Sequence, residues 1–110
     1  MKRIKLKKEM GIAMIARLTF IRIKPDKVEE ATRIYQNSVV PEAKLQKGFS
    51  GGYLLTDAAS GKAVALTFWQ SPEDLAASED NRYYQNQLIK FLDLFVMPPI
   101  KEEYTVFLEY

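Results

Sequence analysis

Residues Lys47 to Leu75 read KGFSGGYLLTDAASGKAVALTFWQSPEDL and carry the clearest secondary-structure signals of the chain. They predict a strand over Tyr53–Thr56, a turn at AASG (residues 58–61), and a partner strand over Lys62–Trp69. Glycine at the end of a short connection is typical of a hairpin, because glycine adopts positive φ without steric cost. We therefore expect these two strands to pair antiparallel.

A helix start follows the hairpin directly. Ser71 can accept a hydrogen bond from a first-turn amide, and Pro72 suits the first helical position. Glu73 and Asp74 place negative charge at the positive end of the helix dipole. The unit is thus strand, turn, strand and capped helix.

N-terminal to this unit, residues 14–24 alternate as a strand does, with apolar side chains on both sides. One side carries Met14, Ala16, Leu18 and Phe20, and the other carries Ile15, Arg17, Thr19, Ile21 and Ile23. Because both sides are largely apolar, we expect this strand to be covered on both faces.

Helical periodicity appears twice. Pro25 and Asp26 open a helix that Pro41 ends or kinks, with an inward stripe of Val28, Ala31, Ile34, Tyr35 and Val39. After Ser71 we expect a short helix to about Ser78 and a longer one over residues 81–95. The buried side of that longer helix is predicted to be Tyr84, Leu88, Phe91, Leu92 and Phe95. Residues 104–110 alternate again and predict a last strand.

This order of elements predicts an α+β fold of the ferredoxin-like βαββαβ type, with a four-stranded antiparallel sheet and helices on one face. We expect the domain to span residues 14–110. The side of the first strand that carries Ile15, Thr19, Ile21 and Ile23 is expected to lie on the face without helices. Because such an apolar face needs covering, we predict a homodimer, a dimeric α/β barrel.

The residue types that the chain lacks restrict its possible functions more than those that it contains. The chain has 110 residues, enough for one modest core, and contains no cysteine and no histidine. Thiolate chemistry and iron–sulfur ligation are therefore excluded, and so are the commonest general base and zinc ligand. We expect no metal and no cofactor. The lack of cysteine favours a cytoplasmic location.

Charge is concentrated at the N-terminus. Residues 1–13 hold five lysine or arginine residues and one glutamate, a net +4 in a chain of net +2. We expect these residues to form a basic, flexible extension, with an anion-seeking arm as the alternative. Because the remaining domain is not basic, we expect no nucleic-acid partner. No segment has the length and apolar character of a membrane span, so no membrane partner is expected.

Four segments together resemble a known family: MIARLTFIRIKP from Met14, GFSGGYLLTD from Gly48, the strand end FW at residues 68–69, and SPEDL from Ser71. They resemble the antibiotic biosynthesis monooxygenase family of dimeric α/β-barrel proteins, and the resemblance covers residues 14–110. Members include cofactor-independent oxygenases of quinols and anthrones, haem-degrading enzymes, and proteins without known activity. The resemblance is carried by turn, core and cap residues, so it indicates the fold better than the reaction.

The resemblance has consequences for individual positions. Trp69 matches a tryptophan that lines a pocket between sheet and helices in the family's oxygenases, and plain core packing is the equal alternative. Ala16 stands where catalytic members tend to carry asparagine. The helical histidine that ligates iron in haem-degrading members has no counterpart, which argues against haem breakdown.

No catalytic residue can be named from the sequence. The candidate substrate-binding residues are aromatic or polar: Phe20, Tyr35, Trp69, Asn81, Arg82 and Tyr84. Arg17 could stabilise an anion, but we favour its pairing with a partner carboxylate inside the dimer barrel.

Two functions remain open. The first is a cofactor-independent monooxygenase that acts on a small aromatic, quinol or polyketide-like compound. The second is a dimeric protein of the same fold, ligand-binding or stress-associated, without turnover. Ala16 and the missing histidine favour the second function, and Trp69 favours the first.

Overall fold

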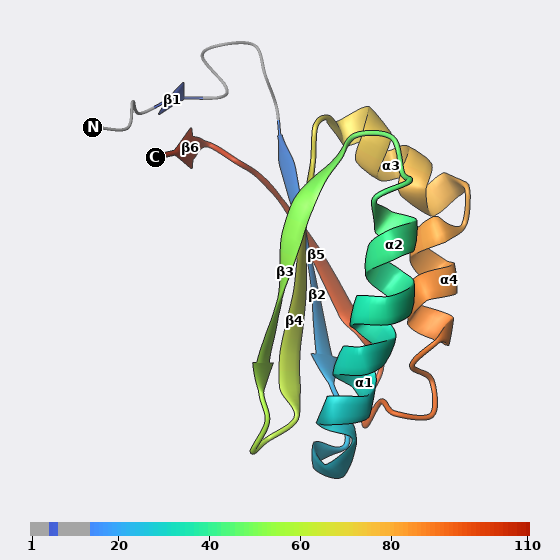
Figure 1. The fold of residues 1–110 in the computed structure, drawn as a ribbon. Helices are drawn as coiled ribbons and strands as arrows, with labels where there is room; N and C mark the ends of the chain where they lie inside the picture. The colour runs from blue at the N-terminus through green and yellow to red at the C-terminus, as the bar shows by residue number, and fades with distance from the viewer. Residues whose placement is uncertain (1–4, 7–13) are drawn as a thin grey trace.

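A computed structural model describes residues 5–6 and 14–110 and shows a sheet with helices packed on one side (Figure 1). The main sheet has four antiparallel strands in the order β3-β4-β2-β5. They are β2 (Ile15–Arg22), β3 (Phe49–Asp57), β4 (Lys62–Trp69) and β5 (Ile100–Thr105). The two central strands are β4 and β2, as in a ferredoxin-like fold, so the predicted α+β class is confirmed.

The helices follow the predicted order but differ in detail. A 3-10 turn (Pro25–Lys27) leads into α1 (Val28–Ile34), a π-helical turn (Tyr35–Val39) and α2 (Val40–Ala43). The second group is α3 (Pro72–Asp80) and α4 (Tyr83–Ile89). Both groups lie on the same face of the sheet (Figure 1).

The hairpin and the helix cap form as predicted. In β3 and β4, Asp57 faces Lys62 and Phe49 faces Trp69. Gly61 has φ +79°, and a Cβ there would lie 1.9 Å from the Ile23 carbonyl oxygen, so only glycine fits this turn. The backbone N–H of Asp74 donates to Ser71 Oγ at 3.1 Å, which caps α3.

The helix that was predicted to end or kink at Pro41 continues past it to Ala43. The π-helical turn immediately precedes α2, in which Pro41 occupies the first turn. Proline has no N–H to donate and its ring crowds the preceding turn, and a widened turn accommodates both effects. Residues of this widened turn line the cavity described below.

The predicted assignment of the sheet faces is wrong. Ile15 and Ile23 are buried in the clusters that pack beneath the helices, and Thr19 bonds to Tyr84 of α4. Their side of β2 therefore faces the helices. The side without a described helix, called the open face here, carries Leu18, Phe20, Tyr53, Leu55, Val64 and Leu66. Both sides of β2 are apolar, so alternation alone could not decide between them.

Two further boundaries differ from expectation. The helix predicted over residues 81–95 ends at Ile89, and the next residues form tighter turns in which Phe91 and Leu92 donate to carbonyls three residues back. Tighter winding changes the buried side, so Leu92 is exposed and Leu94 is buried. The last strand of the sheet is β5, which ends at Thr105, not a strand over residues 104–110.

The predicted extension over residues 1–13 lies outside the described residues except for β1 (Lys5–Leu6). This short strand pairs antiparallel with β6 (Leu108–Glu109) in a separate two-stranded sheet. In Figure 1 this pair lies beyond the end of the main sheet.

Candidate functional site

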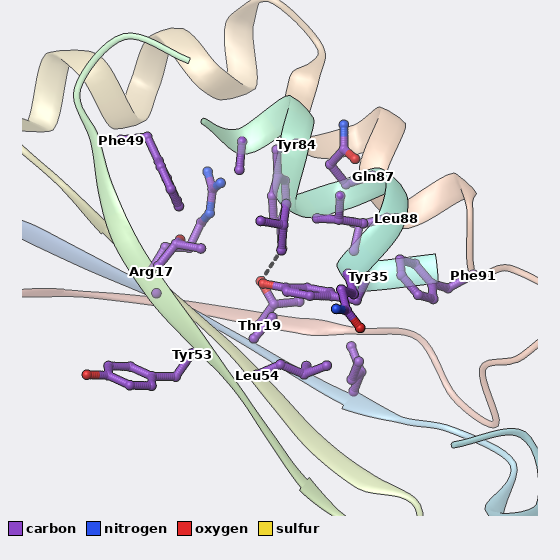
Figure 2. A pocket seen from close by; sticks show the side chains of 18 of the residues that line it. Arg17, Thr19, Tyr35, Phe49, Tyr53, Leu54, Tyr84, Gln87, Leu88 and Phe91 are labelled. Atoms are coloured by element: carbon purple, nitrogen blue, oxygen red, sulfur yellow. Dashed lines mark hydrogen bonds between the residues drawn. The ribbon is translucent and has the colours of Figure 1, made fainter. Parts of the chain in front are cut away.

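A cavity of about 470 Å³ lies between the sheet and the helices. Its floor comes from β2, β3 and β4, and its roof comes from the π-helical turn, α2, α4 and the turn after α4 (Figure 2). This volume is within the range of small-molecule sites. Most of the wall is apolar, and the residues that form the apolar part include Ile21, Val39, Leu54, Leu88, Phe91 and Phe95.

Arg17 of β2 lines the cavity and is almost fully buried, with 3% of its surface exposed. Its Nη1 donates to Ser78 Oγ at 2.9 Å and to Glu79 Oε2 at 3.3 Å. Its guanidinium carbon lies 4.1 Å from the ring centroid of Tyr84 and 5.1 Å from that of Trp69. Two aromatic rings and two acceptors on α3 therefore fix the guanidinium in place.

The charges around Arg17 form a chain that leads out of the cavity. Glu79 bonds to Arg17 and also to Lys101, and Lys101 pairs with Glu103 at 3.3 Å. Burial lowers the pKa of Arg17, whereas Tyr84 and Glu79 oppose this effect. For Glu79, burial favours a higher pKa, but hydrogen bonds and charges from Lys101 and Arg17 outweigh it, so its pKa is lowered. Arg17 and Glu79 therefore form an ion pair.

Tyrosine hydroxyls are among the other polar groups of the lining, which also include the side chains of Thr32, Gln36, Thr67 and Gln87. Tyr84 Oη and Thr19 Oγ1 lie 2.9 Å apart, as the dashed line in Figure 2 shows. Burial raises the pKa of Tyr35, an effect that the charge of Arg17 partly offsets. Burial raises the pKa of Tyr83 to about 12. Both of these tyrosines are therefore neutral at pH 7.

The structure brings together two of the predicted site residues, Tyr35 and Tyr84, which both line the cavity. Trp69 is fully buried and lies behind Arg17 in the core, where its ring contacts those of Phe49 and Tyr83. Its Nε1 donates to Thr67 Oγ1 at 3.0 Å. Of the two alternatives for Trp69, the structure shows core packing.

The other three candidates lie away from the cavity. Phe20 is on the open face of the sheet. Asn81 and Arg82 are exposed at the junction of α3 and α4, where Asn81 Oδ1 accepts from the Tyr83 N–H at 2.9 Å. Arg82 has φ +71°, the left-handed conformation that turns the chain between the two helices. These two residues shape the junction.

The expectation for Arg17 is also wrong. It does not lie in a dimer barrel beside a partner carboxylate, because its acceptors belong to α3 of the same chain. Thr19 was not among the predicted site residues, although it shares the strand parity of Arg17 and its hydroxyl lies 2.9 Å from that of Tyr84. The sequence does contain a signal for this contact, because Arg17 and Thr19 are polar, two residues apart, and on an otherwise apolar side of a strand.

Cavity-lining residues of the described chain include the cations Arg17 and Lys44 but no aspartate or glutamate. Among the described residues, no group of three or more aspartate or glutamate side chains is arranged to hold a metal ion. No helix in that part of the chain has the length and apolar character needed to cross a membrane. The cavity therefore offers apolar walls, hydroxyls and positive charge.

The fold and cavity define a small α+β protein with a ligand-sized site between sheet and helices. Residues 14–87 match the family described as antibiotic biosynthesis monooxygenase, and the chain belongs to this family.

Solved structures with the same fold include a conserved protein from Methanosarcina mazei Go1 (TM-score 0.72, 13% identity, 88% of this chain and 96% of that chain). Another is the ActVA-Orf6 monooxygenase of Streptomyces coelicolor in complex with nanaomycin D (TM-score 0.67, 15% identity, 89% and 90%). Identities this low show the fold alone. A curated relative, the uncharacterized protein Rv2557 of Mycobacterium tuberculosis, is 33% identical over 72 residues, which are 66% of this chain. The matched region spans 31% of that relative's length.

Proposed function

We propose that this protein is a cofactor-independent monooxygenase acting on a small aromatic, quinol or polyketide-like compound that binds between the sheet and the helices. The observation that carries the proposal is the cavity of about 470 Å³, with apolar and aromatic walls and a buried cation beside them. Family membership supports oxygenation as the reaction. Residues 14–110 are proposed to act as one domain.

The proposed chemistry needs a substrate that can become an anion, because the electrons for O₂ come from the substrate itself. In the conversion of a ring CH₂ to C=O, one oxygen atom enters the substrate and the other leaves as water. The substrate supplies all four electrons. The protein supplies a dry site and donors that stabilise the negative oxygen. Arg17, Tyr84 and Thr19 are the donors placed for this role.

The second candidate, ligand binding without turnover, is favoured by one specific observation. No described residue that lines the cavity is an aspartate or glutamate, and the whole sequence lacks histidine. A raised pKa makes Tyr35 and Tyr83 weak candidates for a general base near neutral pH. A substrate that is already ionised in solution needs no general base from the protein. A substrate that is neutral in solution needs one, and the described cavity lining offers no carboxylate or histidine for that role.

We further propose that two copies pair through their open faces. Tyr53 and Leu55, which are 64% and 51% exposed, lie there beside half-buried Phe20 and Leu66. Apolar surface of this kind is costly to leave in water, and an identical sheet would cover it. A cytoplasmic location is part of the same proposal.

Oxygen uptake with a panel of hydroquinones and anthrones tests the activity. We expect uptake by the wild type and loss of most of it in Ala65→Leu, because Ala65 lines the cavity and a leucine there fills it. Ala77→Leu is the matched control, since Ala77 is exposed on α3. No uptake by the wild type contradicts the enzyme and favours binding without turnover. Equal uptake by wild type and Ala65→Leu contradicts this location of the site.

A further inference from the structure

We infer that the cavity selects ligands carrying one ionised oxygen, phenolate, enolate or carboxylate, and holds that oxygen on the Nε and Nη2 groups of Arg17. This inference rests on the proposed role of the cavity as a ligand site. It adds the ionisation state and the orientation of the ligand.

The first observation concerns the hydrogen bonds of Arg17. Both of its bonds within the described chain start from Nη1, and they reach Ser78 and Glu79. Its Nε and Nη2 groups donate to no described residue, although the side chain is buried and lines the cavity. Neither nitrogen is among the fully buried atoms that lack a partner in the described chain, so both keep accessible surface, and an anionic oxygen can accept from two guanidinium donors at once.

The second observation is the sign of the charge on the walls. Two charged residues of the described chain line the cavity, Arg17 and Lys44, and both are cations. The carboxylate that pairs with Arg17 is Glu79, which does not line the cavity and is shared with Lys101, a residue that also pairs with Glu103. These ion pairs balance one another behind the wall, but the charge that the described lining presents to the cavity is positive, from buried Arg17 and exposed Lys44, which favours an anionic guest.

The third observation is polarity along the cavity. Arg17, Thr19 and the Tyr84 hydroxyl gather near one end of the site (Figure 2). Elsewhere most of the wall is apolar and includes Leu54, Leu88 and Phe91, with Tyr35 and Gln87 as neutral polar residues among them. A ligand with one charged end and a largely apolar body matches this arrangement.

Rigid placement of the guanidinium supports selection by charge. The Tyr84 ring stacks at 4.1 Å, and Nη1 is held by α3, so Nε and Nη2 are fixed before a ligand arrives. Donors that are already oriented lose little entropy on binding. Arg17 is therefore a binding residue, and Glu79 is a positioning residue that acts through it.

Two matched pairs of probes test this inference by isothermal titration calorimetry. The first pair is 2-naphthoate and the neutral 2-naphthamide. The second is 2-hydroxy-1,4-naphthoquinone, which is ionised at neutral pH, and its 2-methoxy ether. We expect the anion to bind at least about ten-fold more tightly in one or both pairs, in keeping with a charge-assisted hydrogen bond. Which pair shows the preference distinguishes a carboxylate ligand from an enolate or phenolate.

Two variants and a control sharpen the test. Arg17→Gln is expected to reduce the preference to less than about two-fold, and Arg33→Gln, an exposed arginine of α1, is expected to leave it unchanged. Glu79→Gln keeps an acceptor for Nη1 but removes the opposing charge, so it is expected to tighten anion binding about three-fold. A merely structural role for Glu79 predicts weaker binding instead. If Arg17→Gln does not fold, the inference is still tested by the two probe pairs on the wild type and by the Glu79→Gln variant.

Equal affinity for anion and neutral probe in both pairs overturns the inference, and so does a preference that persists in folded Arg17→Gln or weakens in Glu79→Gln. Failure of all four probes to bind overturns it together with the ligand site. Anion-selective binding without oxygen uptake on any hydroquinone or anthrone upholds the inference and overturns only the proposed activity.

Discussion

The guanidinium carbon of Arg17 lies 4.1 Å from the ring centroid of Tyr84, and the Tyr84 hydroxyl lies 2.9 Å from Thr19 Oγ1. Arg17 and Thr19 are on one side of β2, and Tyr84 is on α4, so this contact joins the sheet to the helices beside the cavity. It also gathers the guanidinium and two hydroxyls at one place in a cavity whose wall is otherwise mostly apolar. The functional proposals depend on this arrangement.

Trp69 is expected to contribute more to stability than to binding. Its side chain is fully buried among Phe49, Tyr83 and the guanidinium of Arg17. Trp69→Ala should lower the free energy of unfolding by about 3 to 5 kcal/mol, measured by urea denaturation, because it leaves a large void. Trp69→Phe should lose clearly less. A loss below about 1 kcal/mol in the alanine variant would show that the ring borders an open space.

Stability should fall at alkaline pH because of Tyr83. Its pKa is raised from 10.0 to about 12, so the folded state keeps its proton where the unfolded state has lost it. The contribution is complete below pH 10 and is lost as pH rises toward 12, amounting to about 2 kcal/mol. Tyr83→Phe should flatten this part of the pH profile of unfolding. An unchanged slope between pH 10 and 12 would argue against a raised pKa at this residue.

The hairpin turn should tolerate no side chain at Gly61. Gly61 and Gly51 both have positive φ, +79° and +109°, but a Cβ at Gly61 meets the Ile23 carbonyl whereas one at Gly51 meets open space. Each alanine variant should lose about 1 kcal/mol from backbone strain. Gly61→Ala should lose at least another 1 kcal/mol, because the chain must shift to relieve the contact. Equal thermal stability of the two variants would mean that the backbone at Gly61 moves away from the Ile23 carbonyl at little cost in free energy.

Charge on the open face should separate the proposed dimer. Leu55→Glu places a carboxylate in the apolar sheet surface, and we expect light scattering coupled to size exclusion to report a monomer at micromolar concentration. Ile89→Glu is the matched control, because Ile89 is an equally exposed apolar residue on α4. A wild type that is monomeric, or a Leu55→Glu variant that stays dimeric, would contradict pairing through this face.

Local signals in the sequence predicted the hairpin and the α3 cap, because glycine at a turn and a Ser-Pro helix start act over a few residues. Local sequence signals could not predict which face of the sheet the helices cover. Both sides of residues 14–24 are apolar, and only the packing of the helices decides which side is covered. The misplaced expectation for Arg17 follows directly from that choice.

The prediction of the site residues also depended on packing between distant segments, which local patterns do not show. Tyr35 and Tyr84 were found because an aromatic on an inward helical stripe faces the sheet. Phe20 was placed on the wrong side of β2 by parity, whereas Asn81 and Arg82 were chosen for polarity in a region that forms a helix junction. The position of Trp69 at a strand end could not show whether its ring lines the cavity or packs in the core, because a tryptophan at that position suits either role.

A crystal structure of the protein with 2-hydroxy-1,4-naphthoquinone would show directly whether the cavity binds an anionic ligand through Arg17. We expect the ring system between β4 and α4, with its ionised oxygen within hydrogen-bond distance of Arg17 Nε or Nη2. A ligand bound on the open face of the sheet, or bound in the cavity with its oxygen turned away from Arg17, would contradict it.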